Sequence, residues 1–94
     1  MDYSNKTKYV AEKGKEFIFR LRNGVEVGRA SSLEEFISKV RTLPIESIEY
    51  HAMNHHFSPW LRYLKLNSAA DSIDKLTSKG EKLRQDIINT LSRF

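Results

Sequence analysis

The chain of 94 residues contains no cysteine, and few of its residues are of the kinds that cross-link or break a fold. The absence of cysteine excludes disulfides, thiolate ligands for zinc and a cysteine nucleophile. Only four glycines and two prolines occur, and the glycines stand apart, which excludes a glycine-rich phosphate-binding loop. No apolar run is long enough to span a bilayer and the first residues lack the apolar core of a signal peptide, so we expect a cytoplasmic protein.

Length and charge predict one small basic domain. A chain of this length supports a single hydrophobic core, and 39% hydrophobic with 30% charged residues is typical of globular proteins. The net charge is +4, and residues 1–30 carry seven lysines and arginines against four acidic residues. Such a basic segment favours a polyanionic neighbour, although ordinary solvated surfaces carry similar charge.

The spacing of apolar residues predicts an α+β fold, in which an N-terminal two-stranded antiparallel hairpin packs on four or five short helices. Residues 1–15 show no apolar periodicity, so we expect a flexible basic arm there. Residues 16–94 are expected to form a single α+β domain, because no interior linker divides them.

The hairpin is the most clearly marked element. EFIFRLRNGVEVGRA alternates apolar and polar residues around Asn23-Gly24, the pair that most readily adopts a type I′ turn. The predicted strands cover residues 16–22 and 25–30. The face that helices must cover carries Phe17, Phe19 and Leu21, with their expected partners Val25 and Val27. The other face carries Ile18, Arg20 and Arg22.

Two helices are expected directly after the hairpin. Ser32 and Glu35 have the spacing of a capping box, and apolar residues at helical spacing continue over 33–42. Pro44 suits the first turn of a second helix, which we expect to end at residue 51 or 52. The expected buried positions of this helix are Ile45, Ile48 and Met53.

Three more helices are expected in the second half of the chain. Ser58 is the predicted N-cap of a short helix, and Asn67 or Ser68 the cap of the next. Ser78 has capping-box spacing with Glu81, before a last helix over residues 80–92. Gly80 could instead kink one continuous helix from residue 69, and we favour a break. The helices and the hairpin are expected to bury a common core of Phe17, Phe19, Phe36, Ile48, Trp60 and Leu64.

Three histidines lie within YHAMNHHFSPW, residues 50–60. His51 and His55 are four apart, so an unbroken helix would place both rings on one face, as a metal site requires. Zinc takes three or four ligands and a good third ligand is missing nearby, so we expect neither a metal site nor a catalytic histidine. We expect His51 to be partly buried and to bond a backbone carbonyl, with His55 and His56 in a bend. Structural packing roles are expected for Tyr50, His51, Phe57 and Trp60.

Several short motifs occur together between Phe17 and Ala70. They are a Phe-x-Phe strand, an Asn-Gly turn, Ser-Leu-x-Glu-Phe, Leu-Pro-x-x-Ser-Ile-x-Tyr-His and Phe-Ser-x-Trp-Leu. This pattern resembles a small archaeal domain family of unknown function, and the resemblance implies no catalytic residue. By size and charge the chain is also similar to the small basic accessory subunits of crenarchaeal family-B replicative DNA polymerase. That likeness implies a noncatalytic protein that docks on a polymerase close to DNA.

The leading interpretation is a noncatalytic accessory or adaptor protein that binds a larger partner, with a DNA polymerase or another nucleic-acid enzyme as the candidate. It rests on the absence of any nucleophile, metal or phosphate-loop motif, and no cofactor is expected. Two alternatives stay open: an autonomous, weak, non-sequence-specific DNA- or RNA-binding protein, and a small histidine-dependent metal protein or enzyme. The candidate residues for binding nucleic acid or a partner are Lys6, Lys8, Lys13, Lys15, Arg20, Arg22 and Arg29.

Overall fold

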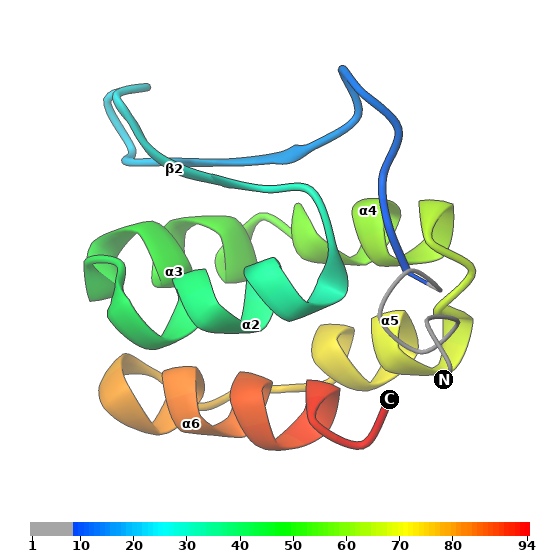
Figure 1. The fold of residues 1–94 in the computed structure, drawn as a ribbon. Coiled ribbons are helices and arrows are strands. Elements are labelled where there is room, and N and C mark those ends of the chain that lie inside the picture. Colours follow the sequence, from blue (N-terminus) through cyan, green and yellow to red (C-terminus); the bar gives the residue numbers. More distant parts are fainter. Residues whose placement is uncertain (1–8) are drawn as a thin grey trace.

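The computed structural model describes residues 9–94, and in this range two strands and five helices follow one another along the chain (Figure 1). The strands β1 (Phe17–Arg20) and β2 (Glu26–Ala30) form an antiparallel hairpin. The helices are α2 (Leu33–Thr42), α3 (Ile45–Met53), α4 (Phe57–Tyr63), α5 (Asn67–Asp74) and α6 (Gly80–Leu91). The expected α+β fold, a hairpin on short helices, is therefore confirmed.

The elements are arranged in three layers (Figure 1). The hairpin forms the first layer and lies over α2 and α3, and α4 continues the layer of these two helices. Helices α5 and α6 form the third layer, where α6 contacts both α2 and α3. One face of the hairpin is thus covered by helices, and its other face points away from them.

Aromatic rings fill the space between the hairpin and the helices. The ring of Phe17 lies 4.8 to 5.9 Å, between centroids, from the rings of Phe19, Phe36, Phe57 and Trp60. Burying each such side chain contributes about 1.5–3 kcal/mol, and tilted or edge-to-face ring pairs add to this. The predicted core is confirmed, because all six of its members are buried: Phe17, Phe19, Phe36, Ile48, Trp60 and Leu64.

The hairpin turn is not the type I′ turn that the sequence predicted. The N–H of Gly24 donates to the carbonyl of Leu21, and the N–H of Leu21 donates to the carbonyl of Val25. The loop between Leu21 and Val25 therefore has three residues, one more than the predicted Asn23-Gly24 pair. Gly24 has a φ of +92°, whereas Asn23 does not have a positive φ. The side chain of Asn23 instead accepts the N–H of Val25 at 3.0 Å, which stabilises this longer turn with its glycine bulge.

The longer turn changes which residues of β2 face the core. Phe19 lies opposite Gly28, where a Cβ atom would come within 2.9 Å of the side chain of Leu43. Val25 is 52% exposed, and Val27 packs only at the margin of the core, next to the bulge in the strand pairing. The prediction that these two valines partner the phenylalanines is therefore wrong.

The part of the expected flexible arm that the structure describes, residues 9–15, is bonded to the domain. Ala11 is buried, and its N–H donates to the carbonyl of Ser31. The N–H of Glu12 donates to the hydroxyl of Tyr63 at 3.0 Å. The domain therefore includes residues before position 16. The apolar pattern did not show this, because in this segment only Ala11 is buried and only Tyr9 packs partly against the core.

Helix α2 has the predicted bounds, and its cap forms as expected. Ser32 is the N-cap, and its hydroxyl accepts the N–H of Glu35 at 3.1 Å. The carboxylate of Glu35 bonds the N–H and hydroxyl of Ser31, each at 2.7 Å, instead of closing the capping box on Ser32. These bonds from Ser31 lower the pKa of Glu35.

The other predicted caps are wrong, although the helices are present. Ser58 lies within α4 and is buried, and Asn67 is the first residue of α5, with no side-chain cap before it. Ser78 donates its hydroxyl to Asp86 at 2.7 Å and does not cap α6. The predicted break at Gly80 is confirmed, because α6 begins there after a separate α5.

Two distant side chains bond the ends of helices in place of local caps. The carboxylate of Glu49 in α3 accepts the N–H of Gly80 at 2.8 Å, at the start of α6. The guanidinium of Arg84, in α6, donates to three carbonyls at the C-terminal end of α2: Val40, Arg41 and Leu43. Both contacts join helices that are far apart in the sequence.

Candidate functional site

The predicted basic residues lie along the hairpin without forming one cluster. Lys6 and Lys8 lie outside the described residues. The others are all exposed: Lys13, Lys15, Arg20, Arg22 and Arg29. The two lysines precede β1, whereas Arg20 and Arg22 lie at and beyond its other end. Lys15 and Arg20 are five residues apart, which at about 3.3 Å per residue places them roughly 16 Å apart in an extended chain, so the two groups of charges are separate.

Two of the predicted cations already have polar partners. Arg29 donates to both carboxylate oxygens of Glu26, at 2.6 and 3.1 Å, and this pairing lowers the pKa of Glu26 and raises that of Arg29. Arg20 donates to the carbonyl of Gly24 at 3.0 Å. Arg22 makes no ion pair within residues 9–94. Of the three hairpin arginines, Arg22 is therefore the one whose guanidinium has neither an ion pair nor a hydrogen bond within residues 9–94.

The four residues with predicted packing roles lie together where α3 and α4 meet the hairpin. Phe57 and Trp60 are buried in the aromatic core. Tyr50 is partly exposed, and its ring lies 5.0 Å from the ring of His51 and 5.4 Å from that of His56. Tyr50 therefore connects the core to the surface.

His51 joins α3 to the end of β1. The residue is 4% exposed, and Nε2 of its ring accepts the backbone N–H of Arg20 at 2.8 Å. Ser47, one turn earlier on the same helix face, donates its hydroxyl to the carbonyl of Arg20 at 2.9 Å. The expected burial of His51 is confirmed. The expected carbonyl partner is wrong, because the ring accepts a hydrogen bond from an amide.

The hydrogen bonds of His51 define its protonation state. Because Nε2 accepts, the neutral ring carries its proton on Nδ1, which lies 3.0 Å from Nδ1 of His56 and donates to it. Burial, followed by the proximity of His56 and Arg20, lowers the pKa of His51 from 6.5 to about 4. At neutral pH the ring is therefore uncharged, with both nitrogens engaged.

The structure separates the histidines that the sequence placed four residues apart. The ring of His55 bonds Asp74 at 3.1 Å, while His51 bonds His56. Among residues 9–94, no three histidine or acidic side chains are grouped to hold a metal ion. The ring of His55 is 64% exposed and borders an open cavity of about 530 Å³, so its partner carboxylate orients it in solvent and not in a closed site.

Two adjoining clefts lie between the hairpin turn and α3, and together we name them the tip groove. The first has a volume of about 420 Å³ and is lined by Leu21, Arg22, Asn23, Pro44 and Glu46. The second, of about 200 Å³, is lined by Arg22, Glu46, Glu49, Tyr50 and Met53. The tip groove therefore brings together Arg22, predicted to bind a partner, and Tyr50, predicted to be structural.

Met53 gives the tip groove an apolar end. It was expected to be buried in the second helix, yet its side chain is 66% exposed. The reason is geometric: Met53 is five residues after the buried Ile48, and at 3.6 residues per turn this places it about 140° away around the helix. A helical-wheel argument could therefore have found Met53 from the sequence. The sequence pattern did not indicate that Glu46 and Glu49 line a groove, because the turn geometry decides which part of α3 faces the hairpin.

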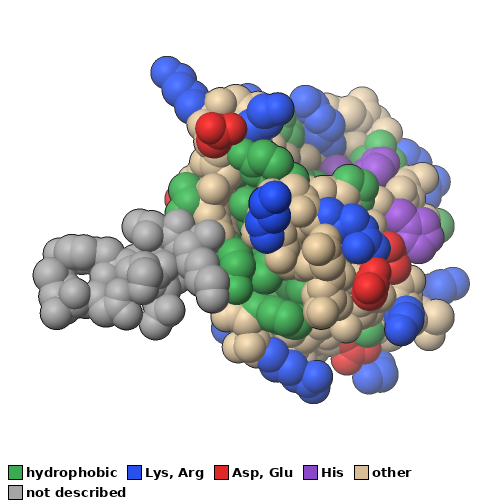
Figure 2. Space-filling model, turned by 90° about the vertical axis from the view of Figure 1, so that its right-hand side faces the viewer, with side chains coloured by type: hydrophobic (Ala, Val, Ile, Leu, Met, Phe, Trp, Pro, Cys, Tyr) green, Lys and Arg blue, Asp and Glu red, His purple; other side chains and the backbone are tan. Residues whose placement is uncertain are grey.

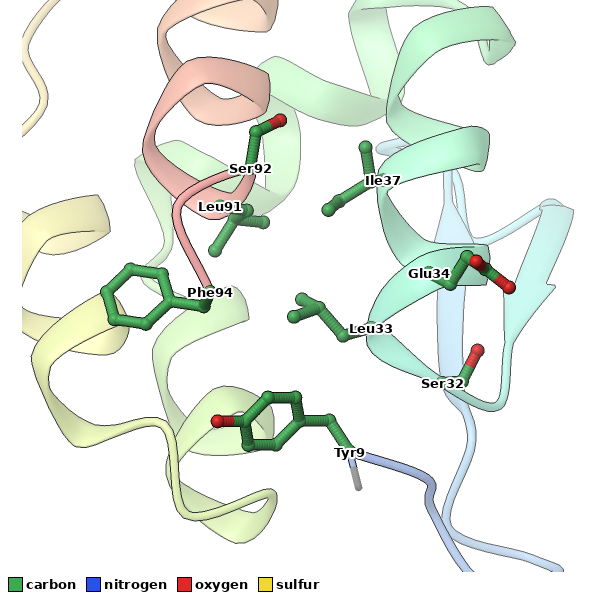
Figure 3. A pocket seen from close by; sticks show the side chains of 8 residues that line it. All are labelled: Tyr9, Ser32, Leu33, Glu34, Ile37, Leu91, Ser92 and Phe94. Atoms are coloured by element: carbon green, nitrogen blue, oxygen red, sulfur yellow. The ribbon is translucent and has the colours of Figure 1, made fainter. Parts of the chain in front are cut away.

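A separate cavity of about 290 Å³ lies where α2 and the end of α6 approach the segment before β1 (Figure 3). The side chains of Leu33, Ile37 and Leu91 border it, together with the rings of Tyr9 and Phe94 (Figure 3). It includes none of the residues that the sequence predicted to bind a partner. Its walls are mainly apolar, and no feature of these walls identifies an occupant.

Basic side chains are scattered over the face of the molecule shown in Figure 2, where other side chains separate them. Helix α6 carries the basic residues Lys82 and Arg84, which a nucleic-acid recognition helix would need to expose on one face. Its Arg84 is occupied by the end of α2, and its Lys82 lies 3.4 Å from Asp86. The face in Figure 2 and α6 therefore lack the continuous basic stripe of a nucleic-acid interface.

Comparisons with protein-family models, curated proteins and solved structures found no match to this chain. The resemblances noted from the sequence motifs therefore stay predictions. Among residues 9–94, none of the helices combines the length and the apolar character needed to cross a bilayer. The function must accordingly be argued from the geometry of the tip groove and the hairpin.

Proposed function

We propose that the protein is a noncatalytic accessory or adaptor protein, and that it binds a larger protein partner at the tip groove. The observation that carries this proposal is that Arg22, Tyr50 and Met53 line one open cleft between two elements. Arginine, tyrosine and methionine are enriched in protein interfaces, and tyrosine and arginine frequently dominate the binding energy.

The chemistry of the tip groove indicates what the partner surface must offer. The exposed side chain of Met53 can be covered by an apolar side chain, and its flexibility allows it to fit one. Full burial of such a side chain contributes about 1.5–3 kcal/mol. Arg22 has no ion pair within residues 9–94 and can bind a carboxylate through two parallel hydrogen bonds. The partner is therefore expected to present an apolar residue beside an acidic one.

The class of partner is inferred from the sequence. The resemblance to polymerase accessory subunits supports a DNA polymerase or another nucleic-acid enzyme. Lys13 and Lys15 are exposed at the opposite end of β1 from the tip groove, where they can lie near a phosphate backbone held by such an enzyme. Autonomous nucleic-acid binding is less well supported, because Arg29 is already neutralised by Glu26.

Affinity capture with charge-reversed variants tests this proposal. The tagged protein is incubated with an extract of its source cells at low and high salt, with and without nuclease. We expect one large protein to be retained after nuclease treatment and to be lost with Arg22→Glu and with Met53→Glu. Arg93→Glu is the matched control for Arg22→Glu, because it makes the same charge change near the C-terminus, far from the hairpin turn (Figure 1). Loss of all retained protein on nuclease treatment would contradict the proposal and favour direct nucleic-acid binding.

A further inference from the structure

The end of the hairpin is attached to α3 through both backbone groups of Arg20. Its N–H bonds His51 at 2.8 Å, and its carbonyl accepts the hydroxyl of Ser47 at 2.9 Å. Directly beyond Arg20, the turn passes over the first cleft of the tip groove, which has a volume of about 420 Å³. Open space therefore lies between the turn and the start of α3, on the outer side of these two hydrogen bonds.

The His51 ring can hold this arrangement only while it is neutral. A neutral imidazole offers one N–H and one lone pair, and His51 uses the lone pair for Arg20 and the N–H for His56. If His51 takes up a proton, Nε2 becomes a donor that faces the donor of Arg20, and this bond is lost.

The groups around His51 do not stabilise a protonated ring. β1 contributes the cationic Arg20, α3 contributes Tyr50, the bend contributes His56, and α4 contributes the apolar ring of Phe57. In the described part of the chain, no carboxylate hydrogen-bonds either member of this histidine pair. A ring that has taken up a proton is therefore more stable outside this site than within it.

We propose that Ser47 and His51 form a proton-sensitive latch on Arg20, with His56 accepting the ring N–H of His51, and that proton uptake by His51 releases the hairpin turn from α3. Release moves one wall of the tip groove, because Leu21 and Arg22 follow directly after Arg20. The latch is a property of the isolated protein. Its effect on partner binding rests on the proposed function.

Amide hydrogen exchange of Arg20, measured by NMR on the full chain without a partner, tests the latch. After correction for intrinsic exchange, protection of the Arg20 amide should fall about 30-fold between pH 7.5 and pH 5, because the pKa of His51 is about 4 when held and about 6.5 when released. Release of the turn alone exposes little surface, so this protection should not change in low urea. Protection of Ile87, in the buried part of α6, should fall with urea.

Two variants separate the latch from other effects of pH. His51→Gln keeps an acceptor for the Arg20 N–H but does not titrate, so protection should change less than about 3-fold over the same range. His55→Gln removes an exposed histidine and should keep the wild-type response. The proposal would be overturned if the Arg20 amide of the wild type were equally protected at pH 7.5 and at pH 5. The proposal would also be overturned if the protection of the Arg20 amide fell with urea as steeply as that of Ile87, since the Arg20 amide would then exchange only through global unfolding. These two wild-type measurements decide the matter even if His51→Gln does not fold, and they do not depend on finding a partner.

Discussion

The indole N–H of Trp60 donates a hydrogen bond to the backbone carbonyl of Lys15 over 2.8 Å. The buried tryptophan of α4 thereby fixes the chain at the point where the basic segment enters β1. Trp60→Ala should lower the free energy of unfolding by about 3–5 kcal/mol through the cavity it leaves. Trp60→Phe keeps most of the ring and loses the donor, so about 1–3 kcal/mol is expected. Urea unfolding measures both, and a loss below about 1 kcal/mol for the alanine variant would place the ring outside the core.

Arg84 should contribute to stability through the three carbonyls that it bonds at the end of α2. Arg84→Ala leaves these carbonyls without their donor, and we expect a loss of about 1–3 kcal/mol in the free energy of unfolding. Arg84→Lys keeps the charge without the planar fork and should recover only part of it. Arg93→Ala, at an exposed position, is the control and should change stability by less than about 0.5 kcal/mol. Equal effects of the two alanine variants would show that the carbonyl contacts do not stabilise the fold.

Stability should fall in mild acid because of His51. Its pKa is about 4 in the folded protein and 6.5 when exposed, so between these values the unfolded chain binds more protons. The contribution of the neutral ring is complete above pH 6.5 and is lost as the pH falls toward 4, by about 3 kcal/mol in all. Urea unfolding at several pH values measures this loss.

His51→Gln supplies the comparison for this pH dependence. Four carboxylates with lowered pKa values also lose their stabilising effect in acid, at lower pH: Glu26, Glu35, Asp71 and Asp86. The difference between wild type and His51→Gln removes their contribution. Parallel curves for the two proteins from pH 7 to pH 4.5 would show that His51 does not titrate as described.

Binding of the isolated protein to nucleic acid should be weak. Because the cations along the hairpin do not form one cluster, we expect a Kd of roughly 10⁻⁴–10⁻⁶ M at physiological salt and no sequence preference. Fluorescence anisotropy at two salt concentrations measures it. Replacing Lys6, Lys8, Lys13 and Lys15 by Gln should weaken binding without unfolding the domain. The Lys13 and Lys15 double variant can be matched with Lys75→Gln and Lys79→Gln, an equal charge change elsewhere on the surface. Nanomolar, sequence-dependent binding would contradict the adaptor proposal.

The sequence predicted the core well because burial follows the periodicity of the apolar residues. Phe17 and Phe19 alternate along a strand, and Phe36 lies at helical spacing in α2, so their faces can be read without the structure. Caps were predicted less well. Glu49 and Arg84 bond helix ends from other elements, and such partners depend on tertiary packing and not on local spacing.

The tip groove could be predicted only in part. The sequence singled out Arg22 and Tyr50 separately, and nothing local showed that they would line one cleft. Their approach depends on the turn, where the side chain of Asn23 stabilises a longer loop than the Asn-Gly pair predicted. A change of one residue in a hairpin loop shifts the strand register, and with it the surface that the hairpin offers to α3.

Site-specific photo-cross-linking from the tip groove tests the central claim most directly. A photoreactive phenylalanine analogue replaces Met53, and in a matched protein it replaces the exposed Asn89 of α6. In an extract of the source cells treated with nuclease, the account predicts one dominant cross-linked protein from position 53 that is absent from position 89. It also predicts loss of this product when Arg22→Glu is introduced. The absence of a cross-linked protein from position 53, or the same products from both positions, would contradict the claim that the tip groove binds a protein partner.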